Sequence, residues 1–286
     1  MARCLQPFQL KETKIDLPCG KCLHCTQRRA SGWGFRLMQE AKQTTDNYFI
    51  TLTYNDTNIK RTPNGFMTLN KTDCQSWFKR IRKSLPKDIK FKYYLAGEYG
   101  EKHYRPHYHI ILLGLPLTYL LSPTDAYHAK NRPEMYLKGS YEFTIESWKF
   151  GHITIGNVED ASAMYTLKYI SKKKRVGKHF RDDRQSEFSL MSKRIGANYI
   201  NDKTKRWHKA DKVKRLYIPI KGGHKIPMPR YYKQKLYSES ELKYINEQLQ
   251  IKFTKEENDK TMTQKQKEYD KLCALRIASE NKQQRL

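Results

Sequence analysis

The 286-residue sequence has no long hydrophobic run. It lacks any stretch of about 18 apolar residues, so we predict no transmembrane helix and no membrane partner. The first residues, Met1-Ala-Arg-Cys-Leu-Gln-Pro7, also lack the apolar segment of a secretory signal. We therefore expect a cytoplasmic location, where thiols stay reduced and cysteines serve metal or thiol chemistry rather than disulfides.

Negative charge is also scarce. Asp and Glu number 29 against 56 Lys and Arg, which leaves a formal net charge of +27 at pH 7. Such an excess repels itself unless a polyanion is bound, and nucleic acid gains affinity from each phosphate that a basic side chain neutralises. The 20 tyrosines add flat surfaces on which bases stack. The composition therefore predicts a nucleic-acid partner.

Apolar periodicity predicts an α+β fold with a central antiparallel sheet and flanking helices. We expect strands at 48–54, 91–98, 108–113, 141–145 and 152–155, and helices at 26–42, 70–85 and 161–174. The short polar stretch 99–106 suits a connection between antiparallel neighbours. A capping box of Thr72 with Gln75 is expected to start the helix at 70–85. Residues 115–138 form a weakly patterned insertion.

Composition also divides the chain into three regions. We expect a cysteine-rich N-terminal segment and helix over 1–45, a mixed core over 46–175 and a basic, partly helical region over 176–286. The basic region has two interpretations. It is either a track for single-stranded nucleic acid, formed by its Lys, Arg and Tyr side chains, or a solvated surface.

His107 and His109 stand two residues apart just before an apolar run. Alternate side chains of a strand share a face, so the two imidazoles point the same way and Tyr108 points the other way. Neutral imidazole is a common metal ligand, and an open catalytic site needs a third ligand. We choose Glu98, at the end of the preceding strand, over His103 in the loop. The alternative is a pair of half-exposed sheet histidines without a metal.

Tyr165, Lys168, Tyr169 and Lys172 repeat the spacing Tyr-x-x-Lys. On a helix, residues four apart are neighbours, so the two phenols lie on one face. A phenol with a pKa of about 10 is a poor nucleophile near neutrality, and a nearby ammonium group favours the phenolate. Paired phenols suit a reaction that cuts a DNA strand and later recloses it. The structural alternative is two core tyrosines with lysines in solvent.

Cys19, Cys22 and Cys25 repeat the spacing Cys-x-x-Cys, and Cys4 offers a fourth sulfur. Four thiolates satisfy tetrahedral Zn²⁺, although the middle cysteine has to serve two overlapping turns. Three closely spaced cysteines also fit an iron–sulfur cluster. Free thiols are the third alternative, and His24 is a substitute ligand.

Three motifs follow one another along the chain: Tyr48-Phe-Ile-Thr-Leu-Thr-Tyr54, Arg105-Pro-His-Tyr-His109 and Tyr165-Thr-Leu-Lys-Tyr169-Ile-Ser-Lys172. Their order resembles the HUH replication initiators in the two-tyrosine form. The N-terminal Pro18-Cys-Gly-Lys-Cys-Leu-His-Cys25 is most similar to the replication initiators of gokushoviruses, small single-stranded DNA phages. The resemblance covers roughly residues 1–175.

The resemblance implies an endonuclease that nicks one strand of a phage origin by tyrosyl transesterification. Such an enzyme stays bound to the 5′ phosphate, frees a 3′ hydroxyl for rolling-circle synthesis and religates the displaced strand. The implied ligands of Mg²⁺ or Mn²⁺, nucleophiles and assisting lysines are respectively His107, His109 and Glu98, then Tyr165 and Tyr169, then Lys168 and Lys172. Expected partners in the bacterial cytoplasm are single-stranded DNA, supercoiled double-stranded origin DNA, and the host helicase and polymerase.

Two other function classes share part of the pattern. A plasmid relaxase or a transposase uses the same chemistry on a different substrate, and the sequence does not separate them from a phage initiator. A non-enzymatic nucleic-acid-binding protein explains the charge and the aromatic residues. It leaves the aligned histidines and the repeated Tyr-x-x-Lys as accidents.

Overall fold

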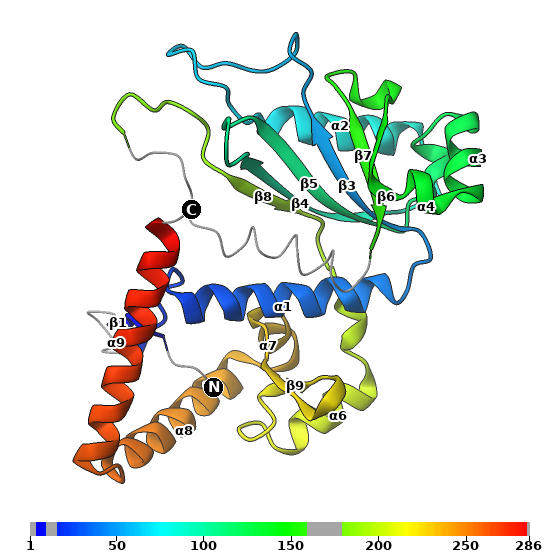
Figure 1. Cartoon of the computed structure of the whole chain (residues 1–286). Coiled ribbons are helices and arrows are strands. Elements are labelled where there is room, and N and C mark those ends of the chain that lie inside the picture. The colour runs from blue at the N-terminus through cyan, green and yellow to red at the C-terminus, as the bar shows by residue number, and fades with distance from the viewer. Residues whose placement is uncertain (1–3, 10–15, 159–178, 285–286) are drawn as a thin grey trace. The chain divides into compact units, whose positions relative to one another are not determined.

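The computed structural model describes residues 4–9, 16–158 and 179–284, which divide into two compact units (Figure 1). One unit combines Met1–Phe35 with Ala197–Leu286, and the other is Arg36–Gly196. Helix α1 (Leu23–Ala41) therefore contributes residues to both units. The helix predicted at 161–174 lies outside the described residues.

A six-stranded sheet in the order β6-β7-β3-β5-β4-β8 forms the centre of the unit Arg36–Gly196. Its strands are β3 (Asn47–Thr53), β4 (Lys92–Tyr99), β5 (Pro106–Leu113), β6 (Lys138–Phe143), β7 (Ile153–Asn157) and β8 (Phe188–Met191). Every neighbouring pair in it is antiparallel. The predicted α+β fold with a central antiparallel sheet and flanking helices is confirmed.

Helix α2 (Lys71–Ser84) lies against one face of this sheet (Figure 1). Its apolar residues recur at helical spacing, so they form one stripe that packs inward. The buried residues of the stripe are Cys74, Trp77, Phe78 and Ile81. They share a hydrophobic cluster with Ile50 and Leu52 of β3 and with Ile110 and Leu112 of β5. Burial of side chains of this size stabilises the fold by about 1.5–3 kcal/mol each.

The first turn of α2 differs from the prediction. The side-chain oxygen of Asn70 accepts hydrogen bonds from the backbone amides of Thr72 and Asp73, at 2.9 and 3.2 Å. A short polar side chain just before the helix is best placed to satisfy these free N–H groups. The predicted capping box of Thr72 with Gln75 is wrong, because the helix begins at Lys71 and Thr72 is already inside it.

Two parts of the unit have more structure than the sequence predicted. The insertion at 115–138 contains a 3₁₀ turn η1 (Leu117–Tyr119) and the helices α3 (Pro123–Asn131) and α4 (Pro133–Tyr136). Leu117, Leu120 and Leu121 of this insertion are buried in the hydrophobic cluster. Strand β8, which was not predicted, pairs with β4 from Tyr94↔Met191 to Gly97↔Phe188 and forms one edge of the sheet.

The other unit has its own hydrophobic cluster, which includes Leu216, Ile218, Met228, Tyr232 and Ile245. Besides the first part of α1, its elements are β1 (Phe8–Gln9), β2 (Asp16–Leu17), η3 (Ala197–Tyr199), α6 (Asp202–Ala210), β9 (Tyr217–Pro219), η4 (Lys221–Gly223), β10 (Lys225–Pro227), α7 (Arg230–Leu236), α8 (Glu239–Asn258) and α9 (Met262–Gln284). Among the described helices, none is both long enough and apolar enough to cross a membrane.

Gly151 lies between the 3₁₀ turn η2 (Glu146–Trp148) and β7. A Cβ atom there would lie 2.2 Å from the carbonyl oxygen of Thr53, and Asn55 ties this segment to Phe150 by a 2.9 Å backbone hydrogen bond. Gly151→Ala should therefore lower the free energy of unfolding by about 1–3 kcal/mol, measured by urea denaturation. The control Gly156→Ala meets its nearest atom at 3.6 Å and should be milder. Equal stability of the two variants would contradict this packing.

Candidate metal centre

The register between two strands brings three potential metal ligands together. In the β4–β5 pair, Glu98 is opposite His107 and Ala96 is opposite His109. Side chains directly opposite on antiparallel strands are nearest neighbours, and diagonal ones are still within reach of long side chains. Glu98 is therefore beside one histidine and diagonal to the other. Ligand atoms of Glu98, His107 and His109 all lie within 4.8 Å of one another.

Both histidines approach the same carboxylate oxygen. The Nε2 atoms of His107 and His109 lie 2.8 and 3.1 Å from Oε1 of Glu98. Glu98 is 8% exposed, and burial by itself would raise the pKa of its carboxyl group. The hydrogen bonds with His107 and His109 outweigh burial and lower that pKa to about 2. Glu98 therefore carries a negative charge at neutral pH.

The second ring nitrogen of each histidine has a partner of its own. Nδ1 of His107 lies 3.1 Å from the carbonyl oxygen of Arg105, and Nδ1 of His109 lies 3.1 Å from Oγ1 of Thr51. A carbonyl only accepts hydrogen bonds, so we assign the proton of the neutral His107 ring to Nδ1. Its Nε2 then directs a lone pair at Glu98. Two acceptors this close repel each other unless the ring is protonated or a cation lies between them.

The donor set fits a divalent cation. Adjacent ligands of an octahedral ion with bonds of about 2.1 Å are separated by about 3 Å, which matches the 2.8 and 3.1 Å between the nitrogens and the oxygen. One carboxylate and two neutral imidazoles leave a divalent ion with a net positive charge, which attracts phosphate. Three protein ligands also leave coordination positions for a substrate.

Strand β3 supports the site from the side of β5. Thr51 is opposite His109 in the β3–β5 register, and the ring of Phe49 stacks on the imidazole of His109 with centroids 5.6 Å apart. Partners of this kind hold metal-binding imidazoles in orientation. Sequence reasoning did not identify Thr51 or Phe49, although alternation along 48–54 places them on one face. The missing information was the register between the strands.

Tyr108, between the two histidines, points to the opposite face of the sheet. Its hydroxyl accepts a 2.7 Å hydrogen bond from the Asn70 amide and lies 2.9 Å from the hydroxyl of Tyr54. Tyr54 in turn donates to Asp73 at 2.8 Å. Burial raises the pKa of both phenols well above the ordinary value. These two tyrosines hold the core together and are poor candidates for a nucleophile.

The remaining predicted residues fall into three groups. The candidate nucleophiles and lysines lie outside the described residues: Tyr165, Lys168, Tyr169 and Lys172. His103, the alternative third ligand, lies in an exposed turn and is not part of the group formed by Glu98. The candidate zinc ligands come together in a second group, Cys4, Cys19, Cys22 and Cys25, without His24.

Comparison with known proteins identifies a family. A family model described as replication-associated protein ORF2 matches residues 47–174. The chain is 31% identical over 243 residues to the replication-associated protein ORF2 of Spiroplasma virus 4, which covers 81% of this chain and 72% of the relative. Identity is 27% with the replication-associated protein ORF4 of Chlamydia phage 1, over 81% of this chain and 57% of the relative.

A further relative is the replication-associated protein VP4 of Bdellovibrio phage phiMH2K, with 28% identity over 75% of this chain and 65% of the relative. The chain therefore spans less than two thirds of two of these relatives. No solved structure matches the chain. The 81% coverage exceeds residues 1–175, so the likeness extends beyond the motifs.

Thr51→Val removes the hydroxyl beside His109 and keeps the shape of the side chain. The affinity for Mn²⁺, measured by calorimetric titration, should fall about 10–100-fold because the imidazole loses its orienting partner. Thr53→Val is the matched control on the same strand, since the Thr53 hydroxyl donates to the backbone carbonyl of His152. It should bind as wild type does. An unchanged affinity in Thr51→Val would show that the hydroxyl does not orient the ligand.

Proposed function

The chain belongs to the replication-associated protein ORF2 family, and from that premise we propose that it is a phage replication initiator that nicks one strand of a replication origin. The observation that carries this proposal is the convergence of Glu98, His107 and His109 on one point of the sheet. Names of the relatives refer to replication, which favours an initiator over a plasmid relaxase or a transposase.

In the proposed reaction, the phenol oxygen of Tyr165 or Tyr169 attacks the scissile phosphorus. A bond forms between this oxygen and phosphorus, and the bond from phosphorus to the 3′ oxygen breaks. The phenol proton passes to a base or to solvent, and the departing 3′ oxygen takes up a proton. Lys168 and Lys172 favour the phenolate through their positive charge. The products are a 5′ phosphotyrosine and a free 3′ hydroxyl that primes rolling-circle synthesis.

The same chemistry closes the circle. One phosphoester replaces another in each step, so the covalent link retains the energy needed for ligation. The second tyrosine attacks the regenerated junction while the first still holds the old end. The freed 3′ hydroxyl then attacks the first phosphotyrosine, which religates the displaced strand into a single-stranded circle and releases that tyrosine. This role for a second nucleophile distinguishes the proposal from simple hydrolysis, which uses only water.

Glu98, His107 and His109 hold Mg²⁺ or Mn²⁺ in this proposal. When bound, the ion supplies Lewis-acid polarisation of the scissile phosphate. The chain keeps the ligands in place through the pairing of β4 with β5 and through Arg105. The Arg105 guanidinium donates to Asp56 at 2.7 Å and to the carbonyl of Tyr54 at 2.6 Å, which anchors the loop before His107.

The proposed substrates are single-stranded DNA and supercoiled double-stranded replicative DNA at the origin. A net charge of +27 supports a polyanionic partner. Host helicase and polymerase are the proposed protein partners, because the 3′ hydroxyl has to be extended while the old strand is displaced. The proposed location is the cytoplasm of the bacterial host.

His107→Ala should remove metal-dependent nicking of a supercoiled circle that carries the origin. Loss of one ligand of an ion that stabilises the transition state by several kcal/mol predicts a rate reduced about a hundredfold or more. The control His103→Ala changes an exposed histidine of the neighbouring turn and should leave the rate unchanged. Wild-type nicking that proceeds equally with and without a chelator would rule out the metal.

Tyr165→Phe combined with Tyr169→Phe should abolish cleavage while most of the DNA affinity remains, because only the hydroxyls are lost. Gel assays of nicking and binding on one DNA preparation measure both quantities. Tyr127→Phe, at an exposed tyrosine, is the control and should cut normally. Cutting at the wild-type rate by the double variant would show that the nucleophile lies elsewhere. Tight binding without any nick by the wild-type protein would favour the non-enzymatic alternative.

A further inference from the structure

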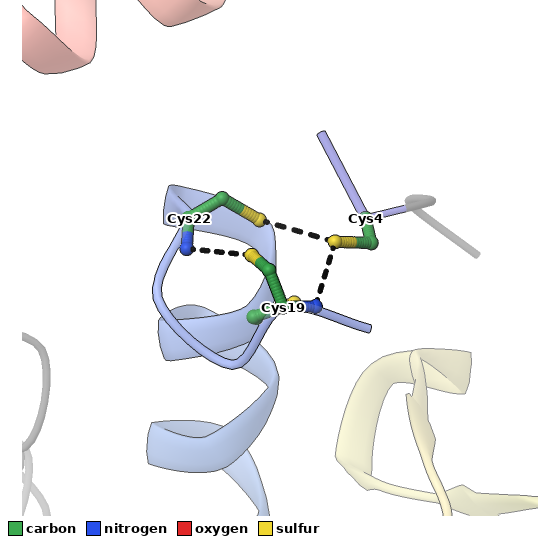
Figure 2. Close-up of side chains that lie close together, drawn as sticks. Cys4, Cys19 and Cys22 are labelled. Atoms are coloured by element: carbon green, nitrogen blue, oxygen red, sulfur yellow. Dashed lines mark hydrogen bonds between the residues drawn. The ribbon is translucent and has the colours of Figure 1, made fainter. Parts of the chain in front are cut away.

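Four cysteines of the N-terminal segment converge on one point. Cys4 precedes β1, Cys19 and Cys22 belong to the turn before α1, and Cys25 lies in the first turn of that helix. Their sulfur atoms all lie within 4.8 Å of one another. Figure 2 shows the side chains of Cys4, Cys19 and Cys22 directed toward each other. Residues separated by up to 21 positions in sequence are thus brought together as one set of thiols.

The spacing of the sulfur atoms indicates which chemistry this set suits. Sγ of Cys4 lies 3.8 Å from Sγ of Cys22, well beyond the roughly 2.05 Å of a disulfide bond. Four thiolates around one tetrahedral ion with bonds of about 2.3 Å are separated by about 3.8 Å. A four-iron cluster instead takes each cysteine on a different iron and holds the sulfurs further apart. The geometry matches a single tetrahedral ion.

Backbone amides around the cluster point at the sulfurs. The four donor–acceptor pairs are Cys19 N to Cys4 Sγ at 3.2 Å, Leu5 N to Cys22 Sγ at 3.4 Å, Lys21 N to Cys19 Sγ at 3.4 Å, and Cys22 N to Cys19 Sγ at 3.3 Å. Two of these bonds are drawn in Figure 2. An N–H group that donates to sulfur stabilises the negative charge of a thiolate, which is the form that binds metal.

The N-terminal segment has little else to hold it together. Strands β1 and β2 have two residues each, and the side chain of Phe8 is 51% exposed. All the residues described at 4–9 and 17–22 are exposed or half-buried. A two-stranded ribbon of this size is not stable in water without further support. A cross-link through the thiols supplies that support, because it ties Cys4 and the turn at Cys19 to helix α1.

We propose that Cys4, Cys19, Cys22 and Cys25 bind one structural Zn²⁺ that fastens the N-terminal segment to the start of α1. Thiolates are soft ligands that select zinc over Mg²⁺ or Mn²⁺. Four protein ligands leave no position for a substrate, so this site is closed and takes no part in catalysis. The proposal is independent of the nicking activity, which belongs to other residues and another metal.

The first test uses the full-length wild-type protein, purified without chelator. Elemental analysis should find one zinc per chain, and Co²⁺ exchanged into the site should give the absorption of tetrahedral sulfur coordination. Alkylation followed by mass spectrometry should modify Cys273 readily and the four ligands only after zinc is removed. Cys74 stays protected in the folded core either way. Absence of zinc, iron in its place or a cobalt spectrum of nitrogen and oxygen ligands would each overturn the proposal.

A second test uses the variants Cys19→Ser and Cys22→Ser, with Cys273→Ser as the matched control. Both ligand variants should lose the zinc and become sensitive to proteases within residues 4–22, while the control keeps its zinc. A full zinc content in the ligand variants would overturn the site. The measurements on the wild-type chain decide the question if the variants do not fold. Nicking assays report on the other metal, so failure of either proposal is recognised separately.

Discussion

Strand β4 hydrogen-bonds to β5 along its whole length, from Lys92↔Leu113 to Tyr99↔Pro106, with Glu98 opposite His107. Successive side chains of a strand alternate between faces, so a slip of one residue would move Glu98 away from both histidines. The connecting turn helps to fix the register through a 2.9 Å hydrogen bond from the Gly100 amide to the Arg105 carbonyl. On the opposite face, Leu95 and Tyr108 are fully buried, which penalises any slip. The candidate metal centre therefore depends on one strand pairing.

Much of the fold could be predicted from local patterns in the sequence, because β3, β4 and β5 alternate polar and apolar residues and α2 carries a clear apolar stripe. Strand β8 is short and half-buried, so its pattern is weak, and only its pairing with β4 defines it. The predicted capping box of Thr72 with Gln75 failed because several residues near a helix start have capping side chains, and Asn70 is the one at the boundary. Tertiary context chose between them.

The candidate metal centre was predictable to the same degree. The spacing of His107 and His109 is local and gave two ligands, and a short polar connection suggested Glu98 as the third. The supporting contacts from Thr51 and Phe49 come from a strand more than fifty residues earlier. Long-range register of this kind is not encoded in any short motif. The four cysteines are similar, since Cys19, Cys22 and Cys25 are recognisable by their spacing whereas Cys4 is placed by the fold.

The two clusters differ in the chemistry they support. One offers a carboxylate and two imidazoles with room for a substrate, and the other offers four thiolates and no open position. A hard ion that activates a phosphate suits the first, and a soft ion that replaces a missing hydrophobic core suits the second. The most direct measurement of the central claim mixes the protein with a supercoiled origin circle and Mn²⁺, then maps any denaturant-resistant adduct by mass spectrometry. We predict a metal-dependent adduct on Tyr165 or Tyr169. Nicking without an adduct, or an adduct that forms equally well in chelator, would contradict it.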